Sequence, residues 1–293
     1  MENKTVFVAG CGLMGSGIAQ VCAQSGHSVI VMDTDKAKLD KAADSIAWSV
    51  RKLVEKGKVA GDPEAIIGRI AYTGNMADAG AADLVIEAVF ENPDVKRGLF
   101  AELEPLCSPE ALLASNTSAI PITEIASVLN HPGRFLGMHF FAPVAFMQAV
   151  EVIRGMATTQ AAMDKAAAFV ATLGKTAVRV RSDIAGFVIN RVNMPSSVEA
   201  IRLVETGVAS VDEVDAGMRL GYGRPMGPLE TQDMSGLDVA LNALTQVYRE
   251  TGDSKFKPPT LLHRKVAAGH LGRKTGIGWY HYDANGKKLG PAV

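Results

Sequence analysis

Two ionisable side chains lie in strongly apolar stretches of the sequence. His139 is in the run 135–143 (Phe-Leu-Gly-Met-His-Phe-Phe-Ala-Pro), and Glu151, 12 positions later, is in the run 149–153 (Ala-Val-Glu-Val-Ile). Burying a carboxylate is costly unless it has a partner, and a buried imidazole supplies one. Such a pair is a general base with the acid that orients it. A histidine satisfied inside the core and a glutamate on an exposed strand edge are the alternative interpretations.

A glycine motif near the start of the chain has the pattern of a dinucleotide site. Residues 10–15 (Gly-Cys-Gly-Leu-Met-Gly) fit G-x-G-x-x-G and lie between a β-branched run and a helical pattern. In this pattern the first glycine permits a tight turn, the second admits a pyrophosphate, and the third lets helix and strand pack closely. The glycines alone could merely turn the chain, so their position carries the interpretation. The predicted cofactor contacts are Gly10, Gly12, Leu13, Met14 and Gly15.

The residue that ends the next predicted strand indicates which nucleotide is bound. Asp33 lies 18 residues after Gly15, where a carboxylate accepts hydrogen bonds from the adenosine ribose. The same carboxylate would repel a 2′-phosphate. We therefore predict NAD rather than NADP as the cofactor.

A second polar segment follows a short apolar run at 112–114. Residues 115–118 read Ser-Asn-Thr-Ser and come at the C-terminal end of a predicted strand. Open parallel sheets bind ligands at that end of their strands, which makes Ser118 a candidate substrate contact. A helix cap before Pro121 would account for these residues equally well.

The elements that must position these residues alternate between strands and helices over the first part of the chain. Such alternation predicts an α/β fold, a Rossmann-type, mostly parallel sheet. After about residue 182 the strand signals stop and apolar residues recur at helical spacing, which predicts a second, all-helical domain. The expected domains are 1–182 and 183–293. The expected strands are 5–9, 28–33, 70–73, 83–88, 112–114, 134–139 and 177–181; the helices are 16–24, 35–56, 93–106, 187–205, 211–220, 229–251 and 259–268.

Composition narrows the class of protein. The chain has 293 residues, a formal net charge of −1 and three cysteines. This charge gives no electrostatic reason to expect binding to nucleic acid or an anionic membrane. An odd cysteine count in a long chain is not typical of a secreted disulfide scaffold. No apolar run approaches a membrane span and no signal peptide is evident, so we expect a soluble, cytoplasmic protein. Without a ligand-rich His and Cys cluster, no metal is expected.

Several separate motifs, in one order over nearly the whole chain, resemble the (S)-3-hydroxyacyl-CoA dehydrogenase family, of the bacterial 3-hydroxybutyryl-CoA dehydrogenase type. They include the glycine motif, the Ser-Asn-Thr-Ser segment and the runs around His139 and Glu151. The remaining motifs are 83–88 with Glu91, Asn92 and Lys96, then 186–191, 225–230 and 271–280.

The resemblance implies roles for residues that spacing alone does not single out. His139 would be the catalytic base held by Glu151, with Ser118 and Asn190 binding the substrate oxygens. Family contacts with NAD fall on Glu91, Lys96, Ser118 and Lys274, and those with coenzyme A on Ser49, Lys56 and Ser118. The family usually forms homodimers, and its dehydrogenases act in fatty-acid β-oxidation. The expected reaction is reversible NAD-dependent oxidation of a (S)-3-hydroxyacyl-CoA to a 3-oxoacyl-CoA.

One position departs from the family pattern. Ala142 follows His139-Phe-Phe where the family has asparagine, so an amide near the base is missing. Either the space opens toward the acyl chain and alters specificity, or neighbouring side chains fill it. Alternative functions are a dehydrogenase of a non-CoA hydroxy acid, a Rossmann methyltransferase and a non-catalytic NAD-binding protein.

Overall fold

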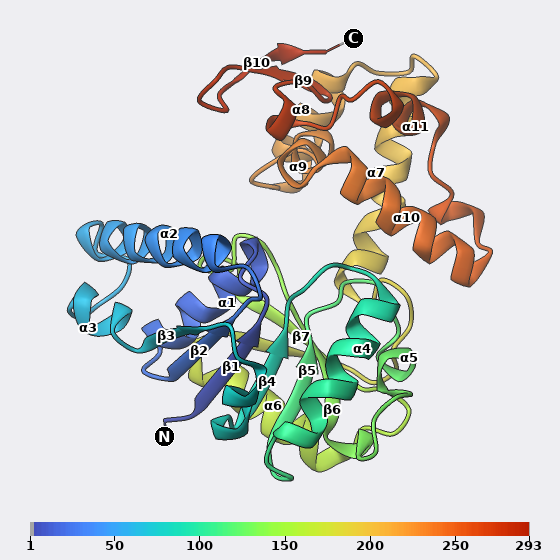
Figure 1. Ribbon diagram of the computed structural model, residues 1–293. Helices are drawn as coiled ribbons and strands as arrows, with labels where there is room; N and C mark the ends of the chain where they lie inside the picture. Colours follow the sequence, from blue (N-terminus) through green and yellow to red (C-terminus); the bar gives the residue numbers. More distant parts are fainter. Residues whose placement is uncertain (1–2, 293) are drawn as a thin grey trace. The chain divides into compact units, whose positions relative to one another are not determined.

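The computed structural model describes residues 3–292, and the chain divides between Phe187 and Val188 into two compact units. The first unit contains an eight-stranded sheet in the order β3-β2-β1-β4-β5-β6-β7-β8 (Figure 1). Neighbouring strands are parallel except for the antiparallel pair β6 and β7. The predicted Rossmann-type sheet is therefore confirmed. Its strands are β1 (Thr5–Ala9), β2 (Ser28–Met32), β3 (Ile70–Thr73), β4 (Leu84–Glu87), β5 (Leu112–Ser115), β6 (Phe135–Phe140), β7 (Ala149–Ile153) and β8 (Thr176–Val180).

Six α-helices accompany the sheet in the described part of this unit. They are α1 (Leu13–Gln24), α2 (Lys36–Glu55), α3 (Pro63–Ile67), α4 (Pro93–Leu103), α5 (Ile122–Ala126) and α6 (Gln160–Thr172). The first begins three residues earlier than predicted, because Gly12 is its N-cap and the glycine turn itself opens the helix. The sequence analysis missed α6, which connects β7 to the parallel strand β8.

The two faces of the sheet have separate cores. Along β1, Val6 and Val8 pack with buried residues of α1, α2 and α6, whereas Phe7 and Ala9 pack with those of α4 and α5. This alternation is the period of two that a strand imposes on its side chains. Because both faces are covered, the strands are apolar nearly throughout, as the sequence pattern predicts.

The long helix α2 supplies one wall of the site described below. Its N-cap, Asp35, accepts hydrogen bonds from the backbone N–H groups of Ala37 and Lys38. Spacings of three and four residues place its core-facing side chains on one stripe. These are Leu39, Ala42, Ile46, Val50 and Leu53.

The second unit is helical, as predicted, with α7 (Ile189–Glu205), α8 (Val211–Tyr222), α9 (Pro228–Ser235), α10 (Leu237–Thr251) and α11 (Thr260–Ala267). The predicted helix 229–251 is wrong in one respect, because it is broken at Gly236, whose φ of 104° is incompatible with helix continuation. A two-stranded antiparallel sheet, β9 (Tyr280–Tyr282) and β10 (Lys288–Pro291), follows the helices and was not predicted.

The described residues contain neither a membrane-spanning helix nor a cluster of metal ligands. No helix among residues 3–292 has the length and apolar character needed to cross a bilayer. Within the same range, His, Cys, Asp and Glu side chains form no group of three or more that could hold a metal ion.

Candidate functional site

His139 and Glu151 face each other across the antiparallel pair of strands. The register of β6 and β7 places the two residues directly opposite, and Nδ1 of His139 lies 2.8 Å from Oε2 of Glu151. The histidine is 5% exposed and the glutamate 0%. In an antiparallel ladder, opposed residues carry their side chains on the same face. The predicted buried pair is therefore present, and the interpretation of Glu151 as an exposed edge residue is wrong.

This contact orients the imidazole. An ionised carboxylate can only accept, so Nδ1–H donates and the lone pair is left on Nε2. No hydrogen bond joins Nε2 to any residue in the range 3–292. The rings of Phe141 and Phe187 lie beside the imidazole, with centroids 4.3 and 5.8 Å from its own. Nε2 is therefore a basic nitrogen with largely apolar neighbours, as a general base requires.

The glycine turn has the geometry that a pyrophosphate needs. Gly10 has a φ of 99°, and a Cβ on Gly15 would lie 1.9 Å from the carbonyl oxygen of Gly10. Both positions therefore require glycine. At Gly12, by contrast, an added Cβ would meet nothing within 4 Å. The chain thus leaves open space at the start of α1, where the free N–H groups of the helix attract an anion. The residues present fit NAD.

Hydrogen bonds from Cys11 and Asp35 fix the carboxylate of Asp33 beside this turn. Its Oδ2 accepts hydrogen bonds from the backbone N–H and the thiol of Cys11, each at 3.3 Å, and its Oδ1 accepts one from the N–H of Asp35. Burial acts to raise the pKa of Asp33, but these hydrogen bonds and the charge of Lys38 outweigh it and lower the pKa. Burial and the neighbouring carboxylate raise the pKa of Cys11 to about 11. At neutral pH, a neutral thiol therefore donates to an ionised carboxylate.

The turn that carries Ser118 is organised by Glu91. Oε1 of this glutamate accepts from the hydroxyl of Thr117 at 2.6 Å and from the backbone N–H of Ser118 at 2.9 Å. The Ser118 hydroxyl is 3.4 Å from the same oxygen. Burial acts to raise the pKa of Glu91, but the charge of Lys96 and the hydrogen bonds from Thr117 and Ser118 lower it overall. An ionised Glu91 therefore fixes the backbone that presents Ser118.

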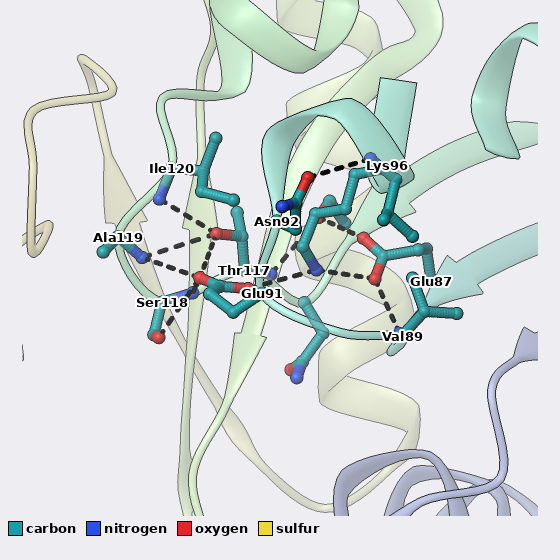
Figure 2. Close-up of polar contacts among 12 residues, drawn as sticks. Glu87, Val89, Glu91, Asn92, Lys96, Thr117, Ser118, Ala119 and Ile120 are labelled. Carbon is teal, nitrogen blue, oxygen red and sulfur yellow. Dashed lines mark hydrogen bonds and ion pairs between the residues drawn. The ribbon is translucent and has the colours of Figure 1, made fainter. Parts of the chain in front are cut away.

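Behind Glu91 lies a buried ion pair, which Figure 2 shows. The ammonium of Lys96 is 2.6 Å from Oε1 of Glu87 and 3.1 Å from Oε2 of Glu91. Lys96 is 1% exposed and Glu87 0%. Glu87 also accepts hydrogen bonds from the hydroxyl of Ser115 at 2.6 Å and the N–H of Val89 at 2.7 Å. With Lys96 enclosed in this way, its charge acts on the two glutamates rather than on the surface.

Sequence reasoning missed two of the polar residues near the strand ends. Glu87 lies within the apolar strand β4, where no spacing signal marks it. Asn116 accepts a hydrogen bond from the backbone N–H of Phe140 through Oδ1, at 2.8 Å. This contact ties the end of β5 to the end of β6, one residue beyond His139. The predicted Ser115–Ser118 segment is thus linked both to Glu87 and to the strand of the candidate base.

A cavity of about 590 Å³ opens next to the glycine turn. We call it the α2 cavity; its walls are residues within 11–20, 38–49 and 142–146. Gly12, Leu13, Ser49 and Ala142 line it, whereas Lys56 does not. Lys56 is the exposed C-cap of α2, one residue beyond the helix. Since Ala142 is exposed and borders open space, neighbouring side chains do not fill the position of the family's asparagine.

Two further predicted residues belong to the second unit. Asn190 is half-buried in the first turn of α7. Lys274 lies in a short 3-10 helix (Arg273–Thr275), with its ammonium 2.6 Å from Oδ1 of Asp238. The roles of both residues rest on the family resemblance.

Comparisons with known proteins agree on one family. Residues 5–184 match the NAD binding domain of 3-hydroxyacyl-CoA dehydrogenase, and residues 186–282 match the C-terminal domain of that enzyme. A probable 3-hydroxybutyryl-CoA dehydrogenase of Deinococcus radiodurans is 46% identical, covering 94% of this chain and 99% of its own.

Solved structures give the same result. The crystal structure of (S)-3-hydroxybutyryl-CoA dehydrogenase from Ralstonia eutropha has a TM-score of 0.90 and 40% identity, covering 96% of this chain and 100% of that one. The crystal structure of FadB2 from Mycobacterium tuberculosis has a TM-score of 0.93 and 40% identity, covering 97% and 100%. The similarity therefore extends over both units of the chain.

Proposed function

Because the chain belongs to the 3-hydroxyacyl-CoA dehydrogenase family, we propose that it oxidises (S)-3-hydroxyacyl-CoA thioesters reversibly to 3-oxoacyl-CoA with NAD. A short acyl group, as in 3-hydroxybutyryl-CoA, is the first substrate to test, since the relatives from Deinococcus radiodurans and Ralstonia eutropha are named 3-hydroxybutyryl-CoA dehydrogenases. The observation that supports the chemistry best is the buried contact of 2.8 Å between His139 and Glu151.

The proton step follows from this contact. Held by the glycine turn and Asp33, the cofactor would supply the hydride acceptor for C3 as NAD and, in the opposite direction, the hydride donor as NADH. Loss of the hydride is possible only as the hydroxyl proton leaves, so a base must reach that oxygen. Nε2 of His139 is the basic nitrogen, and Glu151 stabilises the imidazolium that forms. In the reverse direction, the same nitrogen donates the proton.

Other residues would bind and orient the reactants. Ser118 and Asn190 would hold the substrate oxygens. In comparable sites, one such contact stabilises the transition state by about 3 kcal/mol. The glycine turn and Asp33 would bind NAD together with Lys274. For Glu91 and Lys96 we favour an indirect contribution to cofactor binding, through the backbone that carries Ser118. Ser49 and Lys56 would contact coenzyme A.

The assembly and setting of the enzyme are also proposals. Several large apolar side chains of the second unit are exposed, Val192 at 75%, Leu220 at 86% and Tyr222 at 81%. Pairing with a second copy would cover such surface, so we propose a homodimer. The three cysteines are buried thiols rather than disulfides, which suits a reducing, cytoplasmic setting. A place in fatty-acid β-oxidation would follow from the substrate.

The experiment is an assay of NADH oxidation with acetoacetyl-CoA. We expect turnover with this thioester and, in the opposite direction, oxidation of (S)- but not (R)-3-hydroxybutyryl-CoA. Free acetoacetate serves as the matched substrate without coenzyme A. Faster turnover of the free acid than of the thioester would favour a dehydrogenase of non-CoA hydroxy acids, and no turnover of either would refute the proposal.

A further inference from the structure

An exposed tryptophan lines the α2 cavity. Trp48 is 64% exposed on α2, and Phe146, from the loop after β6, borders the same cavity and is 57% exposed. Trp48 lies outside the stripe of α2 that packs against the core. It therefore contributes little to the helix's packing. Large aromatic side chains left open in a cavity are typical of a binding surface.

The charges beside Trp48 are positive. Lys38, Lys41, Ser45 and Trp48 follow one another at spacings of three and four residues, so they share one face of the helix and all line the cavity. Lys38 is 4.0 Å from the carboxylate of Asp35, whereas Lys41 forms no ion pair with any residue in the described range 3–292. Aromatic rings beside lysines match a ligand that has a flat ring and negative charge. A nucleotide has both.

The position of Trp48 separates this nucleotide from the adenosine of NAD. Asp33, the predicted ribose contact, precedes the N-terminus of α2, and Trp48 is 12 residues into the helix from Lys36. At a rise of about 1.5 Å per residue, this distance is about 18 Å. It exceeds what one adenosine can span, so the adenosine that Asp33 would bind does not account for the exposed ring of Trp48.

Given the proposed function, on which this inference rests, coenzyme A is the substrate part with such a group. We propose that Trp48 stacks on the adenine of coenzyme A in the α2 cavity, with Lys41 beside its phosphates. The ring would make Trp48 a specificity-determining residue that favours full acyl-CoA thioesters over those of pantetheine. Stacking would also give a role to a large apolar ring at an otherwise solvent-exposed helix position.

Fluorescence tests the contact directly, because the chain has two tryptophans and the other, Trp279, is 0% exposed. Iodide in solution should therefore quench Trp48 selectively. We expect coenzyme A to lower the emission of Trp48 and to shield it from iodide, while 4′-phosphopantetheine, which lacks the adenosine, does neither. The Trp48→Phe variant, which keeps Trp279, assigns the signal. Binding of coenzyme A, measured by calorimetry, without any change in Trp48 emission or shielding would overturn the proposal.

Kinetics provide the second arm. Trp48→Ala should raise KM for acetoacetyl-CoA by about 5- to 150-fold, the range that stacking of a base on an aromatic ring contributes. KM for acetoacetyl-pantetheine and for NADH should not change, and Trp48→Phe should stay near the wild type. Leu289→Ala, which removes a side chain of similar exposure, 65%, from β10, is the control.

The outcomes separate this inference from the proposed function. An equal rise in KM for both thioesters, or none, would overturn the role of Trp48 while leaving the dehydrogenase activity intact. If the wild type failed to reduce acetoacetyl-CoA, the proposed function would fail. The fluorescence experiment, which uses coenzyme A itself and needs no turnover, would still decide whether Trp48 binds it.

Discussion

Removing the ammonium of Lys96 should destabilise the first unit strongly. The ion pair with Glu87 is 2.6 Å long, and the two side chains are 1% and 0% exposed. Breaking a buried pair by deleting one partner typically costs about 3–5 kcal/mol, because the other charge is stranded. Glu87 keeps its hydrogen bonds from Ser115 and Val89, so we expect Lys96→Met to cost about 3 kcal/mol, the lower end of that range.

The assay is thermal unfolding followed by circular dichroism. At about 2–4 °C per kcal/mol for a unit of this size, Lys96→Met should lower the Tm by about 6–12 °C. Lys36→Met is the matched control; it breaks a pair with Asp40 of 3.0 Å in which the lysine is 86% exposed, and such pairs contribute about 0–1 kcal/mol.

A double variant tests the physical cause. Lys96→Met combined with Glu87→Leu strands no fully buried charge, because the remaining carboxylate, Glu91, is 42% exposed, so the double variant should recover most of the lost Tm. Both variants should nevertheless lose activity, because Glu91 no longer has its partner at 3.1 Å and the turn carrying Ser118 is released. The reasoning is refuted if Lys96→Met shifts the Tm no more than the control does, or if the double variant is less stable than the single one.

Two further predictions concern specificity. Asp33→Ala should lower kcat/KM for NAD by about 10- to 150-fold, the value of hydrogen bonds to a charged group, with little change for NADP; an unaltered preference between the cofactors would exclude the assigned role. Ala142→Asn, which places an amide in the α2 cavity, should shift kcat/KM toward acetoacetyl-CoA relative to longer 3-oxoacyl-CoA substrates by about 5- to 150-fold, as pocket changes of this size do. An unchanged ratio with an altered Tm would make Ala142 a packing residue.

The contact between His139 and Glu151 could be predicted because each of these ionisable residues interrupts an apolar run. Burying either side chain without a polar partner is costly, so the two are expected to contact each other. Their exact opposition depends on the register of β6 and β7, which the sequence does not specify by itself. Similarly, the glycine turn is predictable because strand, glycines and helix follow one another in a fixed order.

For other residues, the sequence has no pattern that indicates their place in the structure. Lys96 reads as an ordinary surface charge, and its enclosure between Glu87 and Glu91 depends on how the loop after β4 meets the loop after β5. Trp48 lies on a helix whose pattern defines the core-facing stripe but says nothing of a cavity beside the other face. The break at Gly236 also escaped prediction, because an isolated glycine is tolerated inside many helices.

The central claim, that His139 transfers the proton, is tested most directly by kcat for the reduction of acetoacetyl-CoA by His139→Gln. Glutamine keeps a polar side chain of similar size but cannot act as a base at neutral pH. NADH binding, followed by fluorescence, and the Tm serve to establish that the variant is folded and binds its cofactor. We predict normal NADH binding with kcat lower by about 10²- to 10⁴-fold, the usual contribution of general acid–base catalysis. A folded His139→Gln variant with kcat near that of the wild type would contradict the account.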